Sequence, residues 1–579
     1  AHPLDPETIA AARARGLNGR IARILSRRGP VTEATLAACF DDPRAALHDP
    51  ALLPDADACR ARVDRAVAEG ARVCVVGDFD ADGLTGLAIL VLALRARGLD
   101  VLPWIPLREE DGHGIPRRAV DDAAAGGCTL LVSADTGSTS HAEIAYASGL
   151  GIDTIVTDHH ALPADLPPAV ALVNPHRPGS RYPYPDLSGS GVAFKVAQLL
   201  LADAEGGPER ALALADLAAS GTIADLVRPD GENRAICRLG LERIAQDPRP
   251  GIRALLAQAP GGERGGRETV SHVLAPRINA PGRVGGAELA LDLLLAEDAE
   301  SAARIAETIE EKNRIRRRQT ETAIADARAR IAEDAEDGDA GVLVVAGLWP
   351  VGVIGLVAGR RAEETGRPAL VVSTMAEPWR GSARSPGGYD LAAAFAACDA
   401  LLVRHGGHAG AAGCQVEPSR FAELRTALAA QLPPTAAGSR PRDLALDLVV
   451  GGDAVDSVLL GDLAPLEPAG DPPALLGIAE LVVRRIRPVK GGHVQLTFSR
   501  ASGVIDAIAF GRSDLPEMLA EGMAVDVAGR VGRRTWEGIE QLRIEVRDIA
   551  PAGTLRGMRA AAGSAERGVA GAPDAAEAA

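Results

Sequence analysis

Short apolar runs alternate with longer amphipathic segments between residues 72 and 157. The apolar runs predict strands near 72–76, 100–105, 129–133 and 152–157, and the segments between them predict helices near 84–97, 117–125 and 139–148. Gly98, Gly126 and Gly149 follow these helices, where a glycine commonly ends a helix. Because strands and helices alternate, we expect a parallel sheet with helices on both faces.

The pattern changes after residue 160. Residues 160–290 have a mostly helical pattern, and a long charged helix at about 298–333 is interpreted as a solvated connector. A second α/β unit begins at Val342–Ala346 and ends near residue 435. Beyond a Pro/Gly/Ser-rich linker, short alternating strands with glycine turns predict a small β-barrel, which fits an OB-fold.

The predicted architecture is therefore α/β: a long helix joins a parallel-sheet domain to a second α/β domain, and an OB-fold β-barrel follows. A chain of 579 residues is long enough for several domains. The predicted parts are an N-terminal helical segment packed on the first α/β domain (1–70), that domain (71–297), the connecting helix (298–335), the second α/β domain (336–435), the barrel (440–551) and a disordered tail (552–579).

Composition narrows the setting in which the protein works. The formal net charge of −16 argues against a uniformly basic surface, but not against a local groove lined by arginine. The seven cysteines are scattered without a CxxC pair, so we expect neither a disulfide framework nor a zinc ribbon, and a reducing cytoplasm fits best. The most apolar stretch, Leu84–Leu94, is too short to span a bilayer, and we expect no membrane association.

Carboxylates and imidazoles follow three of the predicted strands. Asp78, Asp80 and Asp82 follow the first strand, Asp135 follows the third, and Asp158-His159-His160 follows the fourth. Ligands of open α/β sheets bind outside the carboxyl ends of the strands, so these side chains are expected at one edge. Carboxylate oxygens suit Mg²⁺, while imidazole shifts the preference toward Mn²⁺.

Each acidic cluster by itself is more typical of a turn or a helix cap than of a metal site. A His-His pair by itself is likewise more typical of a surface or a cap. Three such clusters at equivalent strand ends favour a metal site instead. Two cations held there can activate a water and orient a phosphoryl group, which predicts a two-metal phosphoesterase.

Longer motifs give the chain a resemblance to a known family. Gly77–Gly83, Ser133–Gly137 and Asp158–His160 resemble the DHH phosphoesterase superfamily. Further segments resemble its RecJ branch, the single-strand-specific 5′→3′ DNA exonucleases, namely Leu187–Lys195, Gly221–Asp225, Pro276–Arg283, Gly352–Gly355 and Gly406–Gly413. The resemblance runs in order from about residue 15 to 550 and identifies the two α/β domains with the family's DHH and DHH-associated domains.

The resemblance implies two divalent metal ions, Mn²⁺ or Mg²⁺, and a set of catalytic ligands. By motif, these ligands are Asp80, Asp82, Asp135, His159 and Asp225. His160 is implied either as a ligand or as a contact to the phosphate. Asp78 and Asp158 are expected to orient the ligands from behind. Asp225 is identified by the resemblance alone, because it otherwise reads as an acid next to a helix.

The resemblance also implies residues that hold the strand. They are Arg277, Asn279 and Arg283 in a Gly/Pro-containing loop, Arg108, Ser382, Arg384, and Gly406, Gly407 and His408 in a flexible turn. The family's Gly-Tyr-Gly stands here as Gly112-His113-Gly114, which removes one aromatic ring. In the barrel, Trp536 is expected in a turn, where it is a candidate for stacking on a base.

We therefore expect a 5′→3′ exonuclease that releases mononucleotides from single-stranded DNA in recombination and repair. The resemblance implies single-strand binding protein and a repair helicase as partners, and we expect a monomer. One alternative is a DHH phosphodiesterase acting on short oligonucleotides, cyclic dinucleotides or pyrophosphate, which would not need the barrel. Another is a non-catalytic DNA-binding scaffold, which would usually lack several of the ligands.

Overall fold

The computed structural model describes residues 4–556 apart from 30, 32, 109, 260–265, 334–340, 434–443, 470–472 and 537–538. The chain forms two compact units. The larger contains Leu47–Arg228 and Ile236–Arg442, and the smaller contains Ala1–Ala46, Pro229–Ala235 and Asp443–Ala579. Each unit is described by itself.

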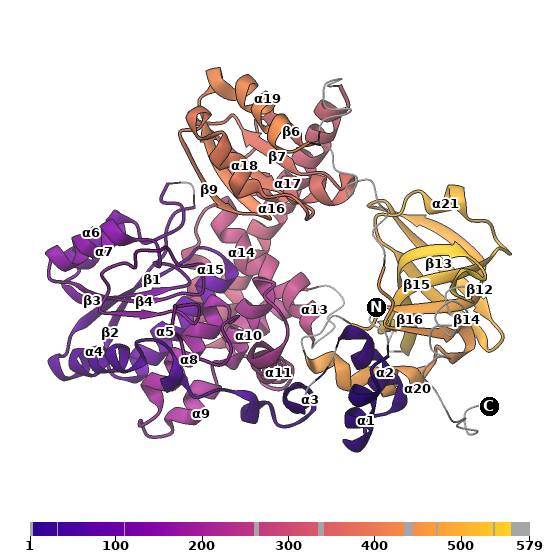
Figure 1. Cartoon of the computed structure of the whole chain (residues 1–579), viewed down its shortest axis with the longest axis horizontal. Helices are drawn as coiled ribbons and strands as arrows, with labels where there is room; N and C mark the ends of the chain where they lie inside the picture. The colour runs from indigo at the N-terminus through magenta and orange to yellow at the C-terminus, as the bar shows by residue number, and fades with distance from the viewer. Residues whose placement is uncertain are drawn as a thin grey trace. The chain divides into compact units, whose positions relative to one another are not determined.

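The first sheet of the larger unit is parallel throughout, with the order β2-β1-β3-β4-β5 (Figure 1). Its strands are β1 (Arg72–Gly77), β2 (Asp100–Trp104), β3 (Cys128–Ala134), β4 (Asp153–Thr157) and β5 (Ala171–Val173). The helices before and between them are α4 (Ala56–Glu69), α5 (Ala81–Ala96), α6 (Arg117–Ala125) and α7 (His141–Gly149). The predicted parallel sheet is confirmed. The sequence pattern did not indicate β5, which is only three residues long.

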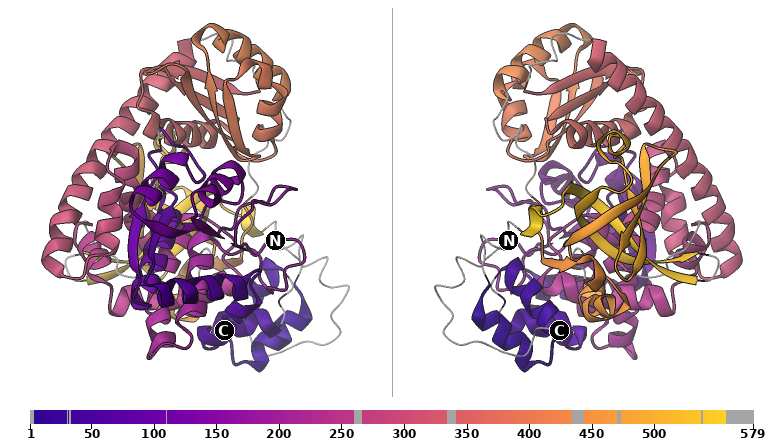
Figure 2. Two further views of the ribbon diagram at one scale, coloured as in Figure 1. Left: turned by 90° about the vertical axis from the view of Figure 1, so that its left-hand side faces the viewer. Right: turned by 90° about the vertical axis from the view of Figure 1, so that its right-hand side faces the viewer.

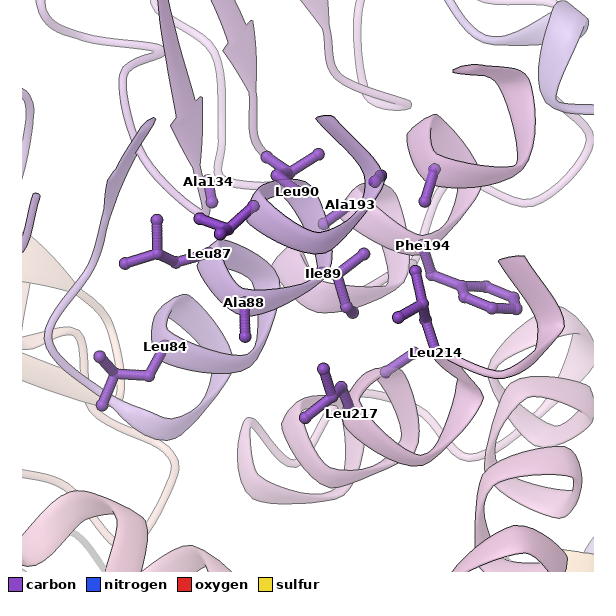
Figure 3. Packing of buried hydrophobic residues seen from close by; sticks show 14 of the residues in the cluster. Leu84, Leu87, Ala88, Ile89, Leu90, Ala134, Ala193, Phe194, Leu214 and Leu217 are labelled. Atoms are coloured by element: carbon purple, nitrogen blue, oxygen red, sulfur yellow. The ribbon is translucent and has the colours of Figure 1, made fainter. Parts of the chain in front are cut away.

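Helix α5 is the centre of the core of this domain. It packs against α8 (Gly189–Leu201) and α10 (Ala215–Ala224), and its side chains are buried on nearly every face (Figure 3). A Cβ atom placed on Gly77 would lie only 2.7 Å from Cβ of Leu87, so the end of β1 presses directly on α5. This contact positions the loop that carries Asp78 and Asp80.

The remaining helices of the domain lead to the connecting helix. They are α9 (Gly207–Leu212), α11 (Gly231–Gln246), α12 (Pro250–Ala257), α13 (Arg267–Thr269), α14 (Ala275–Val284) and α15 (Glu288–Leu294). Helix α14 corrects the expectation of a loop at Pro276–Arg283. Pro276 lies in the first turn, where its missing N–H is tolerated, and Pro281 is accepted inside the helix. Helix α16 (Ala299–Glu333) then runs for 35 residues to the second α/β domain (Figure 2).

The second sheet has the order β6-β7-β8-β10-β9, and only its β6–β7 pair is parallel. Its elements are β6 (Leu343–Gly347), α17 (Val351–Thr365), β7 (Ala369–Ser373), β8 (Trp379–Arg384), α18 (Leu391–Ala397), β9 (Arg404–His408), β10 (Ala411–Val416) and α19 (Phe421–Gln431). Gly406, Gly407 and His408 were expected in a turn but lie in strand β9. A Cβ on Gly407 would lie 2.4 Å from the Ala411 carbonyl oxygen, so the close pairing with β10 requires glycine there.

The smaller unit is built around a closed β-barrel. Strands β12 (Leu476–Val489), β13 (His493–Arg500), β14 (Gly503–Ala509), β16 (Ile539–Pro551) and β15 (Ala524–Trp536) pair in this order, and β15 returns to β12. Strand β11 (Leu448–Gly451) adds to β12, and α20 (Ser457–Leu463) and α21 (Leu515–Met518) complete the unit. The predicted OB-fold barrel is confirmed.

The N-terminal helices α1 (Pro6–Ala14), α2 (Gly19–Arg28) and α3 (Glu33–Phe40) belong to the smaller unit. Ile21, Ile24 and Leu25 share a core with residues of β11, α20 and the barrel, and Arg28 pairs with Asp447 at 2.9 Å. This corrects the expectation that residues 1–70 all pack on the first α/β domain. The apolar face of α2 finds its partner only in the folded C-terminal unit.

The C-terminal residues and the cysteines were each the subject of a prediction from the sequence. Residues 552–556 of the predicted disordered tail are described and ordered, because Leu555 is buried and donates its N–H to Asp526, and this part of the prediction is corrected. The rest of the tail, from 557 onward, lies outside the described residues. The seven cysteines are all buried, and none of them forms a disulfide. Within the described residues, no helix combines the length and apolar composition needed to span a bilayer.

We predict that Leu87→Ala lowers the free energy of unfolding of the larger unit by about 2 to 5 kcal/mol, because it leaves a cavity between α5 and β1. The loss should appear as faster hydrogen exchange at the β1 amides and as a lower denaturation midpoint. Leu150→Ala, at a side chain that is 46% exposed, is the control and should change neither. Equal effects of the two substitutions would contradict the packing described for α5.

Candidate active site

The ends of β1, β3 and β4 bring their polar residues to one edge of the first sheet. Asp80 is the N-cap of α5 and accepts hydrogen bonds from the backbone N–H groups of Asp82 and Gly83, both at 3.0 Å. Asp135 follows β3 in the left-handed backbone region, with φ of 62°. Such a conformation is uncommon for a residue with a side chain, and it marks a constrained site.

The two histidines after β4 point at carboxylates from three other elements. His159 Nε2 lies 3.1 Å from Asp135 Oδ1, 3.8 Å from Asp225 Oδ2 and 4.0 Å from Asp82 Oδ2. His160 Nδ1 lies 3.8 Å from Asp135 Oδ1. The structure thus brings the residues expected as metal ligands into one cluster, including Asp225 at the end of α10.

Three overlapping groups within this cluster have ligand atoms within 4.8 Å of one another. They are Asp135 with His159 and His160, Asp82 with His159 and Asp225, and Asp78 with Asp80 and Asp135. Asp135 is common to two of the groups, as expected for a carboxylate that bridges two ions. The third group also brings Asp78 close enough to be a ligand, whereas the sequence indicated only an orienting role for it.

Two glycines make room for these carboxylates. The residue pattern by itself did not indicate a role for either glycine. A Cβ on Gly189 would lie 2.3 Å from Asp135 Oδ1, and a Cβ on Gly221 would lie 2.4 Å from Asp82 Oδ1. The N–H groups of Gly189 and Ser190, at the start of α8, donate to Asp82 at 2.7 and 3.0 Å. Both glycines lie in motifs that carry the family resemblance. In the sequence, only these motifs could have indicated that the two glycines belong to the site.

Asp158 orients the histidine pair from behind. It accepts hydrogen bonds from the N–H of Ser138 at 3.0 Å and of His159 at 2.8 Å, and it contacts His160 Nδ1 at 2.8 Å. These bonds and the positive charge of His160 hold the pKa of Asp158 below its usual value despite burial. In return, the hydrogen bond to Asp158 raises the pKa of His160 to about 9. The expected orienting role of Asp158 agrees with this geometry.

Three other carboxylates of the cluster, those of Asp80, Asp135 and Asp225, are destabilised as anions. Burial and the negative charges of Asp82 and Asp80 raise the pKa of Asp135 well above its ordinary value. Burial and neighbouring carboxylates likewise raise the pKa of Asp80, and they raise that of Asp225 to about 7. Cations relieve such repulsion directly.

Two oxygens of the cluster also lack hydrogen-bond donors. Oδ1 of Asp78 and Oδ1 of Asp135 are buried and accept no well-aligned hydrogen bond from the described residues, although His159 Nε2 lies 3.1 Å from Asp135 Oδ1. Buried carboxylate oxygens are otherwise satisfied, so a ligand is expected at these atoms. The donor set of carboxylate oxygens and imidazole nitrogens fits divalent Mn²⁺ or Mg²⁺.

Several of the predicted strand-holding residues form a second cluster in the same unit. Arg108 stacks on the Phe79 ring, with its guanidinium carbon 3.8 Å from the ring centroid. Arg283 donates to the Gly352 carbonyl at 3.0 Å, and Arg384 donates to Ser382 Oγ at 3.0 Å. Burial lowers the pKa of Arg108, whereas Asp78 and Asp80 raise it, so this arginine lies beside the carboxylates.

Arg277 and Asn279, the other two predicted strand-holding residues of α14, have different surroundings from those of Arg283. Arg277 is 2% exposed and pairs with Glu310 of α16 at 2.8 Å, so its charge is already balanced. This buried ion pair holds α14 on α16, and the strand contact expected for Arg277 stays a prediction. Asn279 has a buried Oδ1 that accepts no hydrogen bond from the described residues.

The remaining predicted residues lie in more exposed places. Gly406 and His408 are exposed in β9, and no contact among the described residues joins them to the carboxylates. His113 lies over Phe79, with ring centroids 4.8 Å apart, and its Nδ1 lies 3.1 Å from Asp78 Oδ2. Trp536 ends β15 instead of lying in a turn, and its side chain is outside the described part of the structure.

Comparison with protein families matches each folded domain in turn. Residues 72–222 match the DHH family N-terminal domain, residues 339–432 match the DHHA1 domain, and residues 446–548 match the RecJ OB domain. The matched ranges coincide with the first sheet, the second sheet and the barrel.

Individual relatives cover most of the chain. The single-stranded-DNA-specific exonuclease RecJ of Bacillus subtilis is 32% identical over 540 residues, which span 92% of this chain and 68% of that protein. The protein of the same name from Thermus thermophilus is 35% identical over 511 residues, which span 86% and 71%. The crystal structure of RecJ from Thermus thermophilus in complex with Mn²⁺ superposes with a TM-score of 0.77 at 30% identity, covering 95% of this chain and 80% of that one. The three domains match in order, and the clustered carboxylates and imidazoles could hold metal ions. The chain belongs to the RecJ family.

Proposed function

We propose that this protein is a single-strand-specific 5′→3′ exonuclease that hydrolyses phosphodiester bonds of DNA with two divalent metal ions, in recombination and repair. The observation that carries the proposal is the convergence of Asp80, Asp82, Asp135, His159 and Asp225 at one sheet edge, next to arginines that suit phosphate. The names of the relatives, which are exonucleases of this kind, support the substrate and the reaction.

Each part of the cluster has a distinct task in this proposal. Asp82, His159 and Asp225 would hold one ion and Asp80 with Asp78 the other, and Asp135, whose carboxylate is shared by two of the groups, would serve both. Bound together, the two ions supply an activated water and stabilise the leaving oxygen. His160, which is oriented by its contact with Asp158, is placed to donate a hydrogen bond to a phosphate oxygen.

The arginine cluster would hold the 5′ end of the strand. Arg108, Arg283 and Arg384 present guanidinium groups. Each guanidinium group can bind two oxygens of a phosphate at once. Ser382 is positioned by its hydrogen bond to Arg384, and Asn279 has an unused acceptor nearby on α14. Gly406, Gly407 and His408 would add contacts to the same end, and Trp536 would stack on a base at the barrel, as the resemblance implies.

The cellular setting forms a separate part of the proposal. We infer a monomer that works in the cytoplasm with single-strand binding protein and a repair helicase. The resemblance supports the two partners, and the scattered cysteines without a CxxC pair support the reducing cytoplasm. Size-exclusion chromatography with light scattering tests the monomer, and co-purification with each named partner tests the assembly.

The direct test is a degradation time course on end-labelled DNA with Mn²⁺ or Mg²⁺. A single strand labelled at its 5′ end should release labelled mononucleotide at once, whereas a 3′ label should be released last. A blunt duplex of the same sequence should be degraded at least about 100-fold more slowly. Faster hydrolysis of a dinucleotide than of a long strand would instead favour the small-substrate alternative.

We predict that Asp135→Asn lowers the turnover of single-stranded DNA by about 10³-fold or more, because one bridging carboxylate serves both ions. Fluorescence anisotropy with a labelled oligonucleotide should show that strand binding is largely retained. Asp165→Asn, at a loop carboxylate outside the cluster, is the control and should turn over normally. Normal turnover by Asp135→Asn would refute the assignment.

The raised carboxyl pKa values predict how metal-free stability depends on pH. With folded pKa values above the ordinary 3.8, and about 7 for Asp225, the folded state binds more protons than the unfolded state between those values. The stabilising contribution is therefore complete below about pH 4 and is lost as pH rises through about 7. In EDTA, the Tm should fall between pH 6 and 8, and less so for Asp135→Asn. Saturating Mn²⁺ should raise the Tm of the wild type more than that of the variant.

A further inference from the structure

Arginines that are largely buried elsewhere in the larger unit are neutralised by acids. Arg62 pairs with Asp153 at 2.6 Å, Arg249 with Asp216 at 2.7 Å and Arg277 with Glu310 at 2.8 Å. A buried charge without such a partner is costly, so pairing is the expected arrangement. A largely buried arginine that lacks an acidic partner is therefore a candidate for binding an anionic ligand.

Four half-buried arginines are such exceptions. Among the described residues, Arg108, Arg283, Arg316 and Arg384 form no ion pair with a carboxylate. They come from four different elements: the loop after β2, α14, α16 and β8. Three of them are residues expected to hold the strand, whereas Arg316 belongs to the connecting helix, which the sequence indicated only as a solvated connector.

The packing of α16 on α14 places Arg316 beside this group. Glu310 pairs with Arg277 in the first half of α14, and Lys312 Nζ donates to the Gly285 carbonyl just beyond its end at 2.6 Å. The segment 310–316 therefore lies along the end of α14, where Arg283 is located. Burial and the positive charges of Arg108, Arg316 and Arg384 lower the pKa of Arg283 to about 9, so it remains charged at neutral pH.

The side chain of Arg316 is held, but not neutralised. Its Nη2 donates to Oδ1 of the buried Asn313 at 2.9 Å, one helical turn earlier, which fixes the direction of the guanidinium. Its Nε is buried and finds no acceptor among the described residues. Burial and the charges of Arg317 and Arg277 lower the pKa of Arg316, and the nearby Glu310 offsets only part of this effect. An arginine held in this way destabilises the empty protein and gains from an incoming anion.

We propose that Arg316 is a substrate-binding residue, which with Arg108, Arg283 and Arg384 makes a four-arginine site for phosphates of the DNA strand. This inference rests on the proposed function and extends it, because the connecting helix then takes part in binding. Four cations on four elements can contact more than one phosphate at a time. The site would bind through the backbone, without regard to base sequence.

We predict that Arg316→Gln raises the KM for single-stranded DNA by about tenfold and changes kcat by less than about threefold. The slope of log K against log salt should become shallower by about 0.7, the value for one lost phosphate contact on a single strand. The Tm without DNA should stay the same or rise, because the substitution removes a repelled charge. Arg316→Lys should restore part of the affinity, since lysine keeps the charge but not the planar fork.

Arg318→Gln is the matched control on the same helix. Arg318 is 69% exposed and pairs with Glu311 at 3.3 Å, so KM, salt slope and Tm should be unchanged. A lower Tm for Arg316→Gln, with KM and salt slope as in the wild type, would overturn the proposal and show a structural role. An oligonucleotide-binding titration in the Asp135→Asn background separates the two proposals: weaker binding there supports Arg316 even if the wild type fails to degrade DNA, and unchanged binding overturns it.

Discussion

Several carboxylates share one buried space at the end of the first sheet, and their mutual repulsion governs the rest of the site. Asp78, Asp80 and Asp135 present oxygens within 4.8 Å of one another, and burial removes the water that would screen them. Neighbouring N–H groups relieve only part of this repulsion, through Asp80 and Asp82. The remaining charge is balanced by cations, and metal affinity is thus built into the packing of β1, β3 and α8.

The arginine group is the counterpart of this cluster with the opposite sign. Among the described residues its members form no ion pair with a carboxylate, and Arg283 is repelled by the other three at the junction of α14, α16 and the second α/β domain. The chain thus keeps unbalanced negative and positive charge a short distance apart. In the proposed function, a DNA strand with its metal ions would supply the missing charge to both, which would link substrate binding to the assembly of the site.

Much of this arrangement could be predicted from local patterns. The alternation of apolar runs and helices predicted the parallel sheet, and the acids after its strands predicted a metal-type cluster, because parallel strands end at one edge. Prediction failed where packing decides the local conformation. Pro276–Arg283 carries two prolines and a glycine yet is helical, and Gly406–His408 is a strand because β10 pairs closely with it.

The sequence by itself determined the order of the domains, the sheet, the barrel and the types of ligand at the strand ends, because these follow from periodicity and from neighbours along the chain. Only the tertiary structure decided which distant residues meet. It placed α1–α3 on the C-terminal unit, paired Arg277 with Glu310, left Arg316 without an ion pair among the described residues and required glycine at positions 189 and 221. These outcomes depend on space and charge between segments far apart in the chain, and no local pattern records them.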